Sequence, residues 1–371
     1  MRFHVVKRDH CPLWKKACFY LLAVVAALAL GAVLLLALGV NPIDYYTRMF
    51  TMGMIGNKIA YKTMENYLKV FVPLALTSVA LSLAFKMRFW NIGGEGQFIL
   101  GAIAAATVAF KAGPSMPQIV TLILMCLAAM VAAGLYGVFV AALKVKFGTN
   151  ETLMTLMLNY VALYILYFLG EAKADGTFDR DPESVRPDFA SFSKLVAFPE
   201  IAFGKFGLNI CVILTFVIGA LVFVYLKYTK HGYEIAVVGD SAGTARYAGM
   251  KVNRIVLRTV FLSAALIGLA AAFKVGTAGI LSTAITDDVG WTGIIVAWLA
   301  QMNTVMIFLV SALISMLRYG STIAAATFSQ VDSSFANMLQ GAILFLVLAA
   351  DFFIRFRIMP VQKGGKDNGN G

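Results

Sequence analysis

Charged residues are scarce in this chain. Only 13% of its 371 residues are Asp, Glu, Lys or Arg, whereas 60% are hydrophobic, and the mean hydropathy is +0.81. Soluble proteins carry about a quarter charged residues, so too few charges are present to cover a soluble surface of this size. Intrinsic disorder is excluded as well, because it requires low hydrophobicity and high charge. The composition therefore predicts an integral membrane protein.

Histidine and cysteine are also scarce. The three histidines are scattered and the four cysteines form no CxxC pair, so the sequence indicates neither a disulfide framework nor a metal site. The chain also lacks the GxxxxGK[ST] and HExxH patterns of phosphate-binding loops and zinc proteases. A GxSxG match is present at Gly239–Gly243, but it lies in a basic loop between apolar segments and not between a strand and a helix of a hydrolase sheet. We therefore expect no catalytic residue, no metal, no cofactor and no ATP hydrolysis by a phosphate-binding loop in this chain.

About ten apolar segments approach the length of roughly 20 residues that crosses a bilayer core. They cover residues 18–38, 67–86, 97–112, 118–143, 150–170, 208–227, 254–276, 288–301, 303–319 and 333–354. The third, eighth and ninth segments are short, so broken or re-entrant helices are expected there. The expected number of spans is therefore about ten, with an uncertainty of about two. A cleaved signal peptide is the alternative for the first segment, but that segment is too long and ends in a poor cleavage site.

Basic residues account for the net charge of +12 and cluster between the apolar segments. This distribution follows the positive-inside rule and favours a membrane surface over nucleic acid as the partner. It predicts a cytoplasmic segment at 1–17, a transmembrane domain at 18–354 and a cytoplasmic tail at 355–371. Within that domain, the slightly acidic stretch 171–207 is expected outside and the basic stretch 228–253 inside. Both termini are therefore expected in the cytoplasm.

Two further patterns concern helix packing. Ala264, Gly268, Ala272 and Gly276 recur every fourth residue, which predicts close helix approach, with a channel lining as the alternative. Glycine-rich breaks at Gly93–Gln97 and at Asp287–Gly293 each precede an apolar run. These breaks predict an inverted repeat of segments two to five and seven to ten, as in many transporters. Chance similarity of the two breaks is the alternative.

Asn91, Glu95 and Gln97 accompany three glycines within four residues. Exposed backbone at membrane depth needs protein or a watery cavity around it, so these polar residues are candidates for lining a solute path. A capped helix start at a cytoplasmic turn is the alternative.

A polar stripe begins near residue 150, where Thr149 or Asn150 can cap a helix. Glu151, Thr155 and Asn159 follow at four-residue intervals and therefore share one helix face. Polar residues along a membrane helix face protein or water, which makes the stripe a candidate part of the same path. Interhelical hydrogen bonding alone is the alternative.

The largest basic loop contains a third candidate. Asp240 or Ser241 can start a short helix that Gly249 ends. Such a helix suits docking into a partner's groove, with a passive interfacial helix as the alternative. The residues assigned to docking are Gly232, Gly239, Asp240, Ala245, Tyr247, Ala248 and Gly249.

These three blocks resemble the permease subunits of bacterial ABC importers of the branched-chain amino acid, ribose and nucleoside type. Residues 90–102 are similar to the family's FNIGxEGQxxxGA block, with Trp90 in place of Phe, and residues 150–160 match NExxxTxMLNY. The loop around 232–250 resembles GxxxRAxGxNxxAAxYAGI, with departures at its Arg-Ala pair, its Asn and its final Ile. These departures put the identity of the ATPase partner in doubt.

The resemblance covers residues 70–350 and leans towards the nucleoside branch, with riboflavin and simple sugars as alternative solutes. It implies an all-α polytopic permease of the bacterial inner membrane that forms the path for a nucleoside-like solute. It also implies a separate cytoplasmic ABC ATPase, an external substrate-binding protein and a second, non-identical permease. The path would involve Asn91, Glu95, Gln97, Glu151, Thr155 and Asn159.

Two other classes of protein are the alternatives. An ion-coupled secondary transporter normally uses ionisable residues inside the membrane. Here Glu95, Glu151 and Asp351 lie close to segment ends, which counts against that class. A membrane-embedded enzyme is third, and the sequence offers no catalytic set for it.

Overall fold

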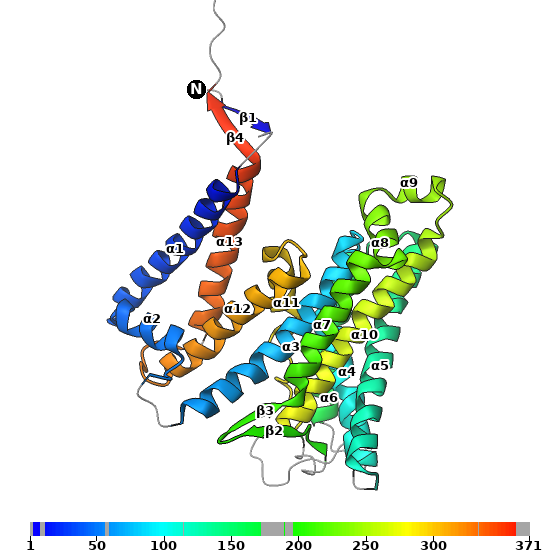
Figure 1. Cartoon of the computed structure of the whole chain (residues 1–371), viewed down its shortest axis with the longest axis horizontal. Coiled ribbons are helices and arrows are strands. Elements are labelled where there is room, and N and C mark those ends of the chain that lie inside the picture. Colours follow the sequence, from blue (N-terminus) through cyan, green and yellow to red (C-terminus); the bar gives the residue numbers. More distant parts are fainter. Residues whose placement is uncertain are drawn as a thin grey trace, which may run out of the picture. The chain divides into compact units, whose positions relative to one another are not determined.

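The computed structural model describes most of the chain (Figure 1). The described residues are 3–7, 12–55, 59–113, 115–171, 189, 196–332 and 334–360. Most of the predicted external stretch 171–207 lies outside them. The chain divides into two compact units, one of Met1–Met52 with Gly320–Gly371 and one of Gly53–Tyr319, which are described separately below.

The first unit brings the two ends of the chain together. Helix α1 (Leu13–Ala37) packs against α13 (Phe335–Arg355). Next to them, β1 (Phe3–Lys7) pairs antiparallel with β4 (Phe356–Pro360), as Figure 1 shows. Because the two strands are hydrogen-bonded, the segment before α1 and the segment after α13 lie at the same end of this helix pair. This arrangement agrees with the prediction that both termini share one compartment.

A helix that the apolar segments did not predict, α2 (Pro42–Thr51), completes the first unit together with the end of α12 (Thr304–Ala325). Asn41 caps α2 by accepting a hydrogen bond from the Ile43 backbone N–H at 3.0 Å. Tyr45 is fully buried and its hydroxyl lies 2.7 Å from the Ser321 hydroxyl of α12. The helix is therefore a packed element of this unit.

The second unit is a helical bundle around two long helices. Its long helices are α3 (Ala60–Lys86), α4 (Gly94–Ala112), α5 (Gln118–Phe147), α6 (Glu151–Glu171), α7 (Ile210–Tyr228) and α10 (Val252–Ala278), with α11 (Val289–Leu299) and the start of α12. Most residues of α3 and α10 are buried. Helix α10 contacts α3, α4 and α5, so it forms the centre of the unit.

Small residues let these helices approach closely, as predicted. A Cβ on Gly101 of α4 would lie 2.7 Å from the Gly268 Cα of α10. A Cβ on Gly268 would overlap the Ala129 carbonyl oxygen of α5, and Gly137 faces Ala264. The stripe on α10 is therefore a packing surface between three helices, and the channel alternative for it is wrong.

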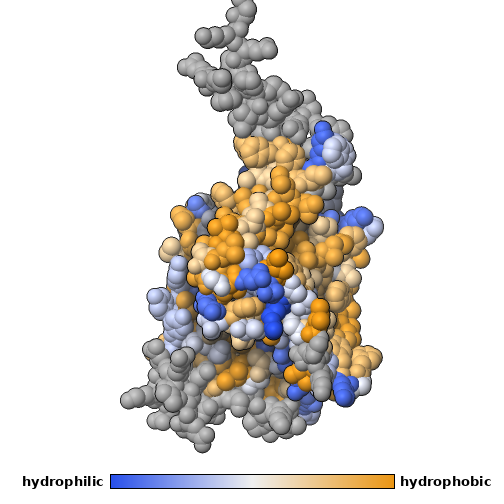
Figure 2. All heavy atoms as spheres, turned by 90° about the vertical axis from the view of Figure 1, so that its left-hand side faces the viewer, coloured by the Kyte–Doolittle hydropathy of each residue, from blue (hydrophilic) through white to orange (hydrophobic). Residues whose placement is uncertain are grey.

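All ten predicted apolar segments are helical. Among the described residues, eight helices are long and apolar enough to span a membrane; α4 and the short α11 are not among them. The ninth segment, predicted to be short, is the 22-residue helix α12 and is one of the eight, so that expectation was wrong. Large apolar side chains are exposed on several spans, and Figure 2 shows hydrophobic side chains over much of one face. The protein is an all-α polytopic membrane protein.

The two ends of the second unit carry different elements. Helices α8 (Lys230–Asp240) and α9 (Ala242–Tyr247) lie at one end of its long helices. The hairpin of β2 (Glu200–Phe203) and β3 (Phe206–Asn209) lies at the opposite end (Figure 1). The basic loop and the described end of the 171–207 stretch therefore lie at opposite ends of this unit.

Candidate functional site

The glycine-rich segment before α4 is held by a pair of amides. The Asn91 Nδ2 donates to the Gln97 Oε1 at 3.1 Å, and the Gln97 Nε2 donates to the Asn91 Oδ1 at the same distance. The Asn91 Oδ1 also accepts from the Gly93 backbone N–H at 3.2 Å. Both side chains are buried, so they shape the turn that leads into α4.

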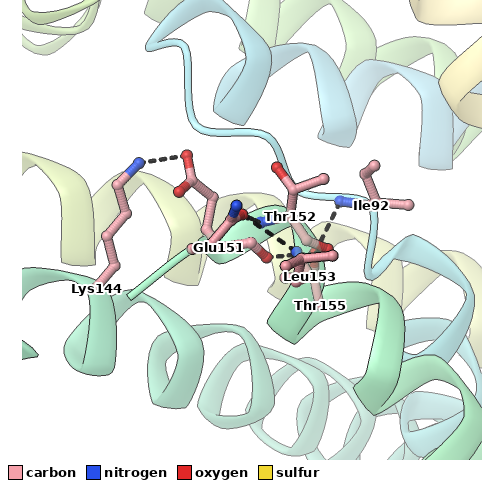
Figure 3. A network of polar contacts seen from close by, with 7 residues as sticks. Ile92, Lys144, Glu151, Thr152, Leu153 and Thr155 are labelled. Atoms are coloured by element: carbon pink, nitrogen blue, oxygen red, sulfur yellow. Dashed lines mark hydrogen bonds and ion pairs between the residues drawn. The ribbon is translucent and has the colours of Figure 1, made fainter. Parts of the chain in front are cut away.

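Two residues of the α6 stripe hold the same segment from the other side. The Asn159 amide donates to the Ile92 carbonyl at 2.9 Å and accepts from the Gly96 N–H at 2.8 Å. The Thr155 hydroxyl accepts from the Ile92 N–H at 3.2 Å, as Figure 3 shows, and donates to the Glu151 carbonyl at 2.7 Å. These side chains form hydrogen bonds with backbone groups of the non-helical segment between α3 and α4 and of the first turn of α4, which have no helical partners.

Glu151 has a different partner. Its carboxylate forms an ion pair with Lys144 at the end of α5 (Figure 3). The same ammonium lies 4.9 Å from the centre of the Phe89 ring. Glu151 therefore joins α5 to α6 at the start of the stripe, one turn before Thr155.

Glu95 links two helix N-termini. Its Oε2 accepts a hydrogen bond from the Gly290 backbone N–H at 2.8 Å, so a side chain of α4 caps α11. Asp288, the residue before α11, has a φ of 53° and makes no side-chain cap. A Cβ on Gly290 would overlap the Glu95 backbone. The positive end of the α11 dipole thus stabilises the buried Glu95 carboxylate, and the two glycine-rich breaks meet in space.

A cavity of about 360 Å³ lies beside this junction. It is lined by Glu95, Asn159, Tyr160, Leu163, Tyr167, Thr283, Ala284, Thr286, Asp287, Asp288 and Trp291. Of the six predicted path residues, only Glu95 and Asn159 are in this lining. Asn91, Gln97 and Thr155 instead lie in the hydrogen bonds that shape its wall, and Glu151 lies in the ion pair with Lys144.

The corner that feeds α11 has an unusual backbone. Asp287 and Asp288 both have positive φ, 47° and 53°, a conformation that Asp tolerates better than most residues. The Arg318 Nη2 of α12 forms an ion pair with the Asp287 Oδ1 at 3.0 Å, and its Nη1 donates to the Thr292 hydroxyl at 3.4 Å. Arg318 is only 9% exposed. This pair fixes the corner and leaves Asp288 on the cavity side.

Helix α9 has one buried and one exposed side. The Ser241 hydroxyl caps it by accepting from the Thr244 N–H at 3.2 Å, and Gly249 ends the turn with a φ of 76°. Ala245 is fully buried, whereas Tyr247 is 97% exposed. The short helix predicted between Ser241 and Gly249 is confirmed, and its outer face is exposed in this chain.

The preceding helix α8, which the sequence pattern did not predict, fastens α9 to the bundle. Gly239 packs directly on the Lys86 carbonyl of α3, where a Cβ would overlap it. The Arg258 Nη2 of α10 donates to the Glu234 Oε2 at 2.9 Å. This guanidinium lowers the pKa of Glu234 below its usual value of 4.5. Of the predicted docking residues, Gly232, Gly239 and Ala245 are buried, and Asp240, Tyr247, Ala248 and Gly249 are exposed.

The comparisons with known proteins decide the family. Residues 63–348 match the family described as "Branched-chain amino acid transport system / permease component". The chain belongs to this family. It is 30% identical to a guanosine ABC transporter permease of Bacillus subtilis, over 93% of this chain and 96% of that protein. It is 29% identical to a glucose ABC transporter permease of Haloferax volcanii, over 97% and 94%.

A third relative is a nucleoside ABC transporter permease of Lactococcus lactis, 27% identical over 95% of each chain. The resemblance drawn from the three sequence blocks, including its nucleoside and simple-sugar branch, is confirmed. The protein is a permease subunit of the ABC transporter type and a multi-pass protein of the inner membrane. Permeases of this family work with an ATPase and a substrate-binding protein.

Proposed function

We propose that this permease forms the path by which an importer takes up a nucleoside-like solute. The observation that carries the proposal is the cavity at the junction of α4 and α11, which combines the ring of Trp291 with the amide of Asn159. Aromatic faces and amides suit a nucleobase. The likeness to guanosine and nucleoside permeases supports this solute class, and the glucose permease supports a simple sugar as the alternative.

The predicted path residues divide into two roles in this proposal. Glu95 and Asn159 line the path. Asn91, Gln97 and Thr155 position its wall through their hydrogen bonds to the segment before α4. Glu151 positions the start of α6 through Lys144. The meeting of the two breaks at Glu95 and Gly290 supports the proposed inverted repeat.

We propose that the energy comes from a separate subunit and that this chain does not itself hydrolyse ATP. The exposed face of α9 around Tyr247 is the proposed contact with the cytoplasmic ATPase. Its support is the tight attachment of α8 to α3 and α10, which lets force on α9 reach the bundle. We also propose that a second, non-identical permease completes the path. Lipid is proposed to cover the apolar outer faces of the helices.

The test is uptake by the whole importer in proteoliposomes. We expect uptake of labelled guanosine to require ATP and to survive an uncoupler when ATP is held constant. Uptake that follows a proton or sodium gradient without ATP would contradict the proposal and favour a secondary transporter. Co-purification tests the assembly, since an active complex with copies of this permease alone would rule out the non-identical partner.

A further inference from the structure

The cavity beside Glu95 has an uneven charge. Among its described lining residues, three are acidic and none is Lys or Arg. Two cations lie near the Asp287 corner: Arg318 is engaged by Asp287 and Thr292, and the partly buried Lys274 interacts electrostatically with Asp287. The lining therefore offers carboxylates, amides, hydroxyls and aromatic rings to a solute, but no free cationic side chain.

The helix N-termini do not offset this charge. Such termini attract anions through free backbone N–H groups. At α11, however, the Gly290 N–H already donates to the Glu95 carboxylate. The Gly96 N–H in the first turn of α4 is likewise bound by Asn159. At each of these two helix starts, one backbone N–H is thus occupied by a side chain of the protein itself.

Asp288 adds a carboxylate on the open side. It is exposed, lines the cavity and does not cap α11. The positive φ of Asp287 and Asp288 and the Asp287–Arg318 pair hold this corner in place. Trp291, one turn further, and Tyr167 of α6 line the same cavity with aromatic surface.

We propose that this cavity is a charge filter that binds an uncharged, ring-containing solute with hydroxyl groups and rejects its phosphorylated form. The Asp288 carboxylate accepts hydrogen bonds from solute hydroxyls, and Trp291 covers a face of the ring. A phosphate in the same place meets the exposed Asp288 carboxylate, while Arg318 and Lys274 interact with Asp287, and this repulsion is unfavourable in a partly dehydrated site. This inference deepens the proposed function and rests on it for the identity of the path.

Thiol labelling tests the filter without an ATPase. In a chain whose four native cysteines are replaced, Thr283→Cys is labelled with a cationic and an anionic methanethiosulfonate of similar size. Relative to free cysteine, we expect the cationic reagent to react about tenfold faster, because nearby carboxylates attract it. Asp288→Asn should reduce this preference about threefold or more, whereas the matched change Asp44→Asn on α2 should leave it unchanged. Equal rates for the two reagents, or no labelling by either, would overturn the proposal.

Protection by solutes is the second measurement. Guanosine should slow labelling of Thr283→Cys by an uncharged thiol reagent, whereas guanosine monophosphate at the same concentration should not. Trp291→Ala should abolish protection and keep the charge preference, while Trp14→Ala, at an exposed site of α1, should change neither. Equal protection by the nucleotide would overturn the filter. Because labelling needs no transport, failure of guanosine uptake with an intact charge preference would count against the proposed function alone.

Discussion

The backbone N–H of Gly290 donates to the carboxylate of Glu95 at 2.8 Å, although 195 positions separate the two residues. This bond joins the N-termini of α4 and α11 and closes one wall of the cavity. The bond also explains why Glu95 is buried in a membrane protein, because its carboxylate caps the N-terminus of α11.

The first prediction concerns the contact at Gly290. In Gly290→Ala the new methyl group overlaps the Glu95 backbone, so α4 and α11 must separate. We expect a loss of about 1–3 kcal/mol in stability, as for other overpacked sites, together with a large loss of uptake. Thermal unfolding in detergent and ATP-driven uptake measure the two effects.

The matched control is Gly341→Ala on α13, where nothing lies within 4 Å of the added Cβ. Alanine favours a helix over glycine by about 0.5–1 kcal/mol, so this variant should be at least as stable as the wild type. If Gly290→Ala has the same melting temperature and the same uptake as Gly341→Ala, the close contact between Gly290 and Glu95 is wrong.

The second prediction tests whether Asn159 holds the backbone of the segment before α4 in addition to lining the cavity. Asn159→Leu leaves the Gly96 N–H and the Ile92 carbonyl without their partner. Each buried group costs about 1–3 kcal/mol, so the melting temperature should fall clearly. Asn159→Asp keeps the acceptor for Gly96 and should be intermediate at neutral pH. An unchanged melting temperature in Asn159→Leu would show that these bonds do not hold the segment.

Much of the fold follows from the sequence because bilayer thickness limits the choice. Apolar runs long enough to cross it can only be helices or barrel strands, and these runs are too long for strands. Helix α2 was missed since it is amphipathic and short, although Asn41 and Pro42 form a recognisable helix start. The pairing of β1 with β4 could not be predicted, because strand partners so far apart leave no local signal.

The candidate site could be predicted only in part, because the sequence shows which residues avoid lipid but not what they contact. A polar stripe at Thr155 and Asn159 tells which helix face avoids lipid, but not whether its partner is solute or backbone. The cap of α11 by Glu95 depends on a tertiary contact that no spacing rule contains. Asp288 lies in a break that the sequence did single out, and only the left-handed backbone there places it beside the cavity.

The third prediction concerns coupling. Tyr247→Ala removes a side chain that is almost fully exposed, so folding and membrane insertion should be unaffected. We expect affinity for the ATPase and ATP-driven uptake to fall about tenfold or more, as at other aromatic hot spots. Tyr228→Ala, at an exposed tyrosine at the end of α7, is the control and should retain both. Normal assembly of Tyr247→Ala with the ATPase would exclude α9 as the docking surface.

The fourth prediction uses the pair of Glu234 and Arg258. The guanidinium lowers the pKa of Glu234 in the folded protein below the usual 4.5 of an unfolded chain. The pair therefore contributes its full stability above about 4.5, and this contribution is lost as the pH falls through the lowered folded value. Glu234→Gln should remove that part of the pH dependence. Parallel melting curves of wild type and Glu234→Gln from neutral to acidic pH would contradict it.

The measurement that tests the account most directly is uptake after the cavity is filled. The importer carries Thr283→Cys in a chain whose native cysteines are replaced, and it is reconstituted and modified with a bulky maleimide. ATP-driven uptake is then measured with guanosine or with glucose, according to which of the two the unmodified importer transports. Asp44→Cys, modified in the same way, is the control. We predict that modification at position 283 blocks uptake and that modification at position 44 does not. Full uptake after complete modification at position 283 would show that the solute does not pass through this cavity.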